Sequence, residues 1–394
     1  MTFREIADSV GVGEYTPLLD EVYASLTDMD TPACDISLID SLQSEWNLFG
    51  EFYELVRALA LEVNQDIARS AWVKVTAKYA MCQDDAGARE VPVPQPDGTA
   101  VTAMLPLYTL LPIIPVGIQE YRARGFSDEE VAELLKQYRS GIAIVKKQSG
   151  MPGINKTYYN WLMHFAKAII FQTDGMQFEL RQLPENVVYL KNKVSGEVLP
   201  IMNSGIIHKS GLNMLGSGGF EDADGSFCGE FREDDKSYYG YACIDSKVQT
   251  KCGTYSKAEW EVFLRPGDDC LSIHIPRGTD ISNEALDRYF AAGRQIARER
   301  YPEHNGVAIF GSSWILDPNL IPLVGPESKI AGLQSRFIKY PQKTTGKDCF
   351  SFVFGKPNYE DYQELPEQTS LQRKLKQLYL SGGCTHSFAG IVIE

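Results

Sequence analysis

The chain has 394 residues, of which 44% are hydrophobic and 23% are charged, and its formal net charge is -14 at pH 7. This length exceeds what one hydrophobic core usually supports, so we expect two domains. The negative charge disfavours binding to nucleic acid or to an anionic membrane surface. The eight cysteines include no CxxC pair, and the N-terminal segment lacks the basic start and apolar run of a secretory signal. We therefore expect reduced thiols and a cytoplasmic, bacterial-type protein.

The first part of the chain, residues 1–172, has the apolar spacing of helices. Apolar residues repeat every three or four positions in three stretches, residues 37–80, 126–145 and 158–171. The second stretch opens with a capping box that runs from Ser127 to Glu130. These patterns predict a helical N-terminal domain.

The most apolar segment, residues 101–118, has the composition of a membrane span but not its regularity. Pro106, Pro112 and Pro115 interrupt the helical hydrogen-bond ladder that a bilayer demands. We predict a buried, kinked core segment and no membrane partner.

Near residue 172 the pattern changes to short alternating runs separated by glycines. Strands are predicted in residues 175–183, 186–192, 197–211, 236–244, 259–269 and 270–276. Next come a helix at about 283–301, a strand at 306–316 and a helix at 318–337. They are followed by strands at 337–340 and 349–355, a helix at 369–383 and a last strand at 388–394. The fold class is therefore α+β. A helical domain of residues 1–172 precedes a domain of residues 173–394 with a mixed, mostly antiparallel sheet flanked by helices.

Several strings in the second half carry a resemblance to a known family. They are GMQFELRQL, WEVFLRPGDDCLSIHIPRG, SSWILDPNL, SKIAGLQSRF and LPEQTSLQRKLKQLYLSGG. With them the chain resembles bacterial two-domain acyltransferases, which have an N-acyltransferase N-terminal domain and a GNAT-like C-terminal domain, the fold of GCN5-related N-acetyltransferases. The resemblance implies a small-molecule amine as acceptor and acyl-CoA as co-substrate, with no tightly bound cofactor.

In that fold, a turn between a strand and a helix reads R/Q-x-x-G-x-G/A, and its backbone amides bind the pyrophosphate of coenzyme A. The equivalent turn here is RGTDIS, residues 277–282. Its candidate cofactor-binding residues are Arg277, Gly278, Thr279, Ile281 and Ser282. However, Asp280 and Ser282 replace the two late glycines, and their oxygens can cap the helix themselves while Asp280 repels a phosphate. The substitutions favour a self-capped helix start over a phosphate site.

Acyl transfer to an amine needs a base for the ammonium and a donor for the developing oxyanion. His274, at the end of a strand that would line the cleft, is the first candidate base, and His208 is the second. Ser313 is a candidate hydroxyl for orienting water or a carbonyl. For each of these residues, a structural hydrogen bond to nearby backbone is the alternative. The tyrosine that serves many such enzymes as acid is replaced by Gly332, five residues before Phe337.

No metal site is predicted. Asp222 and Asp224 are spaced as in a calcium loop, but Phe227 occupies the position that requires glycine.

Two hypotheses follow from these residues. The first is a GNAT-like acyltransferase with acyl-CoA as donor and a small-molecule amine as acceptor. The second is a binding module of the same fold that has lost its catalytic activity. The acyl group, the acceptor and the oligomeric state stay open.

Overall fold

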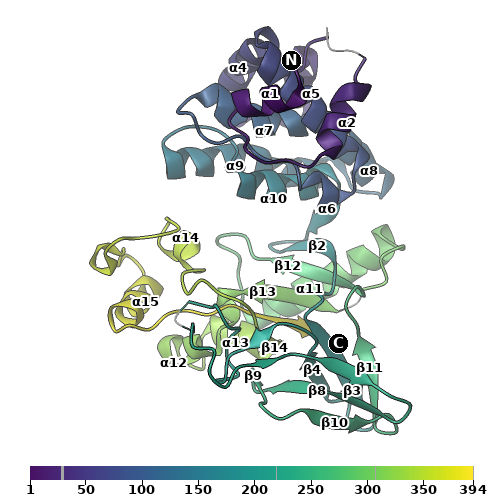
Figure 1. The fold of residues 1–394 in the computed structure, drawn as a ribbon, viewed down its shortest axis with the longest axis vertical. Helices are drawn as coiled ribbons and strands as arrows, with labels where there is room; N and C mark the ends of the chain where they lie inside the picture. Colours follow the sequence, from purple (N-terminus) through teal and green to yellow (C-terminus); the bar gives the residue numbers. More distant parts are fainter. Residues whose placement is uncertain (28–30, 219, 307, 394) are drawn as a thin grey trace. The chain divides into compact units, whose positions relative to one another are not determined.

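The computed structural model of the chain describes residues 1–27, 31–218, 220–306 and 308–393. The chain separates into two compact units, Met1–Gln172 and Thr173–Glu394 (Figure 1). The first unit is helical and the second contains the sheets, so the predicted α+β class is confirmed.

The helices of unit 1 are α1 (Phe3–Ser9), α2 (Leu18–Ser25), α3 (Ile36–Trp46), η1 (Gly50–Phe52), α4 (Tyr53–Gln65), α5 (Ile67–Cys82), α6 (Asp85–Ala88), α7 (Ala100–Leu110), α8 (Ile114–Ala123), α9 (Asp128–Ser149) and α10 (Lys156–Ala166). A short strand, β1 (Ile170–Gln172), ends the unit. The predicted capping box is present at the start of α9, where Ser127 accepts a hydrogen bond from the Glu130 amide and Glu130 accepts one from the Ser127 amide. The predicted helix over 158–171 is too long, because α10 ends at Ala166 and β-branched Ile169 and Ile170 favour an extended chain.

The apolar segment with three prolines forms α7 and α8. Pro106 lies inside α7 and Pro115 lies in the first turn of α8. Among the described residues, Ala100–Ala123 is the one stretch long and apolar enough to cross a membrane, and most of it is buried inside the protein. It has the predicted character of a kinked core segment.

Unit 2 contains two main sheets. The strands are β2 (Gln177–Gln182), β3 (Val187–Asn192), β4 (Val198–Met202), β5 (Ile206–Ile207), β6 (Phe227–Cys228), β7 (Phe231–Glu233), β8 (Ser237–Ile244), β9 (Lys247–Val248), β10 (Gly253–Ser256), β11 (Trp260–Leu264), β12 (Asp269–His274), β13 (Ile309–Ser313), β14 (Ile338–Pro341) and β15 (Phe388–Val392). Within this unit, one sheet has the order β2-β12-β13-β15-β14 and the other has the order β10-β8-β4-β3-β11. Among the described residues of this sheet, β12 and β13 alone pair in parallel, through a crossover that contains α11 (Asn283–Arg300), so the first sheet is mixed as predicted.

The first sheet lies between a helix and the second sheet. On one face, α11 packs so closely on β2 that a Cβ at Gly293 would lie 2.5 Å from the Phe178 ring. On the other face, Phe310, Tyr340 and Ile391 share a buried cluster with residues of β3 and β4. Burial of both faces explains why the central strands read as apolar runs.

Two predictions for the last hundred residues are wrong in detail. The helix predicted over 318–337 is divided into η3 (Pro318–Leu320), α12 (Ile321–Val324) and α13 (Lys329–Ser335), because Gly325 has a φ of 96° and Pro326 follows it. The strand predicted over 349–355 is the helix α14 (Phe350–Val353). Its aromatic rings at Phe350 and Phe354 are four residues apart and pack together against α15 (Ser370–Leu380), which a helix permits and a strand does not.

The contact between Gly293 and Phe178 generates a stability prediction. Gly293→Ala should lower the free energy of unfolding by about 1–3 kcal/mol, because α11 or the Phe178 ring must move to admit a methyl group. Gln295→Ala, on the exposed side of the same helix, should change it by less than about 0.5 kcal/mol. Urea unfolding followed by circular dichroism measures both, and equal stabilities would contradict this packing.

Candidate active site

The two central strands of the first sheet separate at their carboxyl ends. Among the described residues, the β12–β13 ladder ends at the pair Ser272–Phe310. The outer ladders continue, since β2 pairs with β12 as far as His274 and β15 pairs with β13 as far as Ser313. We call the facing, unladdered segments, 273–274 of β12 and 311–313 of β13, the strand gap. In the described part of the chain, β12 and β13 form no ladder with each other beyond the pair Ser272–Phe310.

The face of the sheet that carries Cys270 changes from apolar to polar toward the strand gap. Cys270 and Phe310 belong to the core between the sheets, whereas Ser272 and His274 follow on the same face. On β2, Glu179 lies opposite Ser272 and Gln177 lies opposite His274. Gln177, Glu179 and Ser272 are buried. Burying polar groups is costly unless they are hydrogen-bonded, so this row of buried polar side chains marks a candidate functional site.

His274 is paired with a carboxylate. Its Nε2 lies 2.9 Å from Oε2 of Glu179, and the two side chains are 32% and 7% exposed. A carboxylate beside an imidazole orients the ring and stabilises the imidazolium that forms when histidine takes up a proton. The pair can therefore act as a base that remains partly accessible.

The RGTDIS turn leads from β12 to α11. Gly278 has a φ of 90°, which glycine adopts without strain, and Arg277 is exposed. Thr279 donates a hydrogen bond of 2.7 Å to the carbonyl oxygen of Gly175 and so ties the turn to the start of β2. Ile281 is half-buried.

The predicted self-capping of α11 is present only in part. Ser282 is the N-cap residue, but its side chain makes no hydrogen bond to the first helical amides. Instead, its hydroxyl and its amide both donate to the carboxylate of Asp280, at 2.9 and 3.0 Å. The amides at the start of α11 are thus left without a side-chain cap, and this is the arrangement that attracts an anion.

Asp280 also joins α11 to α13. The ammonium group of Lys329 lies 2.7 Å from Asp280 Oδ1. This ion pair and the hydrogen bonds from Ser282 lower the pKa of Asp280 to about 2. The carboxylate is therefore negatively charged at neutral pH, with a lysine beside it. A turn further along, Arg336 pairs with Asp287 and holds the same two helices together.

The structure places the other predicted site residues as follows. Ser313 ends β13 within the strand gap, and its hydroxyl accepts a hydrogen bond from the amide of Ile315. His208 follows β5, which pairs with β6 in a separate two-stranded sheet, and its Nδ1 contacts Ser210 at 2.9 Å. The structure thus brings Ser313 and His274 to the same end of one sheet, while His208 lies on another.

Sequence reasoning missed Glu179. Its string, GMQFELRQL, alternates polar and apolar residues, which suggests a strand with one solvated face. The role of Glu179 becomes visible only when the register with β12 is known, because that register sets it diagonally across from His274.

Comparison with known proteins identifies the class of this fold. The chain matches the GNAT-like C-terminal domain over residues 170–392, and it belongs to that family. No curated protein matches the chain.

Solved structures of acyltransferases share the fold over its whole length. An acyltransferase mutant in complex with octanoyl-CoA has 19% sequence identity and a TM-score of 0.67. An acyltransferase in complex with decanoyl-CoA and teicoplanin has 18% identity and a TM-score of 0.65. In both cases the similarity covers 100% of this chain and 99% of the other. The predicted two-part, GNAT-like architecture is confirmed.

The hydrogen bond from Thr279 to Gly175 predicts a stability effect at the turn. Thr279→Val should lower the free energy of unfolding by about 1 kcal/mol, because the hydroxyl is lost and the Gly175 carbonyl loses its donor. Ser282→Ala removes a hydroxyl that donates to an exposed carboxylate and should cost less. A thermal unfolding comparison of the two variants tests this order, and a larger loss for Ser282→Ala would contradict it.

Proposed function

We propose that this protein is an acyl-CoA-dependent N-acyltransferase that transfers an acyl group to the amine of a small molecule, in the cytoplasm. The observation that carries the proposal is the early end of the β12–β13 ladder beside the Glu179–His274 pair. The similarity in fold to acyltransferases that were solved with octanoyl-CoA and decanoyl-CoA supports the choice of donor.

The strand gap suits the arm of an acyl-CoA. The pantetheine arm contains two amides, and these can bond to strand backbone much as an added strand does. The segments 273–274 and 311–313 border the place where such an arm would lie. Bound in this way, the thioester would lie next to the polar row on β2 and β12.

The start of α11 supplies the groups for the phosphates. Its first amides have no side-chain cap, and Arg277 is exposed in the turn that precedes them. Asp280 opposes an anion, but Lys329 balances its charge at 2.7 Å. In water, one unit charge about 4 Å from another contributes roughly 1 kcal/mol, so Asp280 weakens phosphate binding without excluding it.

The chemistry requires a neutral amine that attacks the thioester carbonyl. His274 takes the proton from the acceptor ammonium, and Glu179 stabilises the resulting imidazolium. The amine nitrogen then bonds to the carbonyl carbon, the bond to the coenzyme sulfur breaks, and the departing thiolate takes up the proton that the nitrogen loses. Gly332 stands where many enzymes of this fold have the tyrosine that protonates the leaving thiolate.

Two observations favour the alternative, a binding module without catalysis. Phe337 and Ile273 fill the helix-covered side of the strand gap, since a Cβ at Gly311 would lie 2.8 Å from the Phe337 ring and 3.5 Å from Ile273. The Asp280–Lys329 ion pair lies just before the first turn of α11, where the phosphates would bind. Acyl-CoA binding without turnover would favour this second function.

The first functional prediction concerns the base. His274→Ala should reduce kcat/KM for acyl transfer by about 10²- to 10⁴-fold, and Glu179→Gln should reduce it by less, because the imidazole remains. His304→Gln is the matched control, since His304 contacts the carbonyl of Cys270 at the opposite end of β12. A thiol-release assay with octanoyl-CoA and a panel of amines measures the three variants. Full activity of His274→Ala would remove this residue from the mechanism.

The second functional prediction concerns the donor. Asp280→Asn should tighten binding of octanoyl-CoA by about tenfold, because the change removes a negative charge and releases Lys329 toward the phosphates. Glu299→Gln is the charge-matched control at the far end of α11, roughly 25 Å away. Isothermal titration calorimetry gives both affinities. Unchanged binding of Asp280→Asn would place the phosphates elsewhere.

A further inference from the structure

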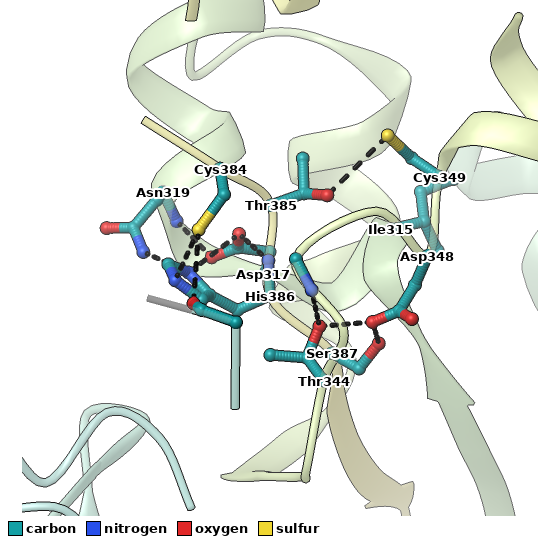
Figure 2. A network of polar contacts seen from close by, with 12 residues as sticks. Ile315, Asp317, Asn319, Thr344, Asp348, Cys349, Cys384, Thr385, His386 and Ser387 are labelled. Atoms are coloured by element: carbon teal, nitrogen blue, oxygen red, sulfur yellow. Dashed lines mark hydrogen bonds and ion pairs between the residues drawn. The ribbon is translucent and has the colours of Figure 1, made fainter. Parts of the chain in front are cut away.

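A second group of reactive side chains lies at the carboxyl end of β13. Asp317 follows β13 and η2 (Trp314–Leu316), whereas Cys384 and His386 precede β15, the strand that pairs with β13. Figure 2 shows the three side chains converging: the Cys384 sulfur and the Asp317 carboxylate approach the two nitrogens of the His386 ring. Asp317 thus meets His386, which lies 69 positions further along the chain, at one site.

The geometry is that of a nucleophile, a base and an orienting acid. Cys384 Sγ lies 3.3 Å from Nε2 of His386, and His386 Nδ1 lies 3.4 Å from Oδ2 of Asp317. Exposure decreases along the series: Cys384 is partly exposed, His386 is 8% exposed and Asp317 is 1% exposed. Cys384 is therefore the most accessible residue of the three, and the acid is shielded from water.

Asp317 is held in place. Its Oδ2 accepts a hydrogen bond from the amide of His386 at 2.8 Å, and its Oδ1 accepts one from the amide of Asn319 at 2.9 Å. Both bonds fix the carboxylate beside the imidazole, and a carboxylate in that position favours a protonated ring. Burial opposes the charge on His386, but Asp317 and Cys384 outweigh it and raise the pKa of His386 to about 9.

The neighbouring Cys349 is a thiol of the same domain whose surroundings make it unreactive, and it serves as a comparison for Cys384. It is fully buried, contacts the hydroxyls of Tyr379 and Thr385, and has no imidazole partner among the described residues. Burial raises the pKa of Cys349. Cys384 differs in both respects that make a thiol nucleophilic, namely access and a cationic partner.

Two glycines lie next to the sulfur. Cys384 Sγ contacts the carbonyl oxygen of Gly218 at 3.7 Å, and a Cβ at Gly346 would lie 3.6 Å from the same sulfur. Gly218 also lines a hollow whose remaining walls come from Gly216, Glu221, Lys343, Thr344, Thr345 and Asp348. Gly218 is therefore common to the contact with the thiol and to the wall of this hollow.

We propose that Cys384, His386 and Asp317 form a second reaction centre in which Cys384 Sγ accepts the acyl group of a thioester. The acyl donor is chosen because this centre and the strand gap lie at the same end of one sheet, where Ser313 pairs with Phe388. In this choice of donor the inference rests on the proposed function, whereas the reactivity of the thiol does not.

The reaction is a thioester exchange. The Cys384 thiolate attacks the carbonyl carbon, and a new carbon–sulfur bond forms as the bond to the donor sulfur breaks. The departing thiolate takes the proton from Nε2 of His386, which becomes neutral. The products are S-acyl-Cys384 and the free donor thiol, and no oxidant or further reactant is needed.

The first test compares Cys384 with thiols of the same protein. Cys82, Cys228 and Cys252 are exposed and serve as internal references. With limiting iodoacetamide at pH 6.5, peptide mass spectrometry should show Cys384 alkylated about tenfold to a hundredfold faster than these references, because an ordinary thiol is only about 1% ionised at that pH. His386→Asn, checked for folding by circular dichroism, should abolish the difference. Equal rates in the unmodified protein would overturn the proposal without recourse to any variant.

The second test looks for the acyl group. The protein is incubated with octanoyl-CoA or with the octanoyl thioester of N-acetylcysteamine, which requires no nucleotide binding. We expect one octanoyl group on Cys384, removable by neutral hydroxylamine, in both the unmodified protein and His274→Ala. Absence of the group with both donors would overturn the proposal. Labelling by the small thioester alone would support this centre and count instead against acyl-CoA in the proposed function.

Discussion

The unequal lengths of three strand ladders are the constraint on which the candidate site depends. β12 and β13 are each fixed along their whole length by an antiparallel neighbour on the outer side, but their own parallel ladder ends at Ser272–Phe310. Two well-anchored strands can therefore diverge without disturbing the rest of the sheet. The end of this ladder places the segments 273–274 and 311–313 at a fixed position in the sheet. A ligand with amides of its own can lie beside these segments without changing the fold.

The polar row beside the strand gap shows how the same strands serve both packing and chemistry. From Cys270 to His274, β12 passes out of the core between the sheets and into a polar environment on the same face. Glu179 is 6% exposed, and burying a carboxylate is costly unless a partner offsets the loss of hydration. The imidazole of His274 provides that partner at 2.9 Å. Stability and function are therefore coupled here, because the group that makes Glu179 tolerable is also the candidate base.

The sequence predicts the helices and strands of this fold better than it predicts which residues of different elements contact each other. Apolar spacing, the Ser127–Glu130 capping box and the alternating runs predict the helical unit, most strands and α11, since these patterns depend on neighbouring residues alone. The strand predicted over 349–355 failed because its aromatic residues pack within a local cluster with α15, and an apolar run of that length fits either structure. Glu179 could not be linked to His274 without the register of β2 and β12. Likewise, His386 reads as a loop residue until β15 is placed beside β13, which brings Asp317 and Cys384 to its two nitrogens.

The turn before α11 illustrates why a motif must be interpreted by its contacts. Asp280 and Ser282 are good capping residues, and from the letters alone they would satisfy the helix amides. In the structure Asp280 accepts hydrogen bonds from Ser282 and pairs with Lys329, so the first amides of α11 have no side-chain cap and a charged pair lies before them. A pair of opposite charges can reorganise around an anion in a way that two glycines cannot, because Lys329 can exchange its carboxylate partner for a phosphate. Asp280 and Ser282, which replace glycines of the usual turn, are therefore compatible with a donor site. In such a site the anion contacts Lys329 on α13 as well as the backbone amides.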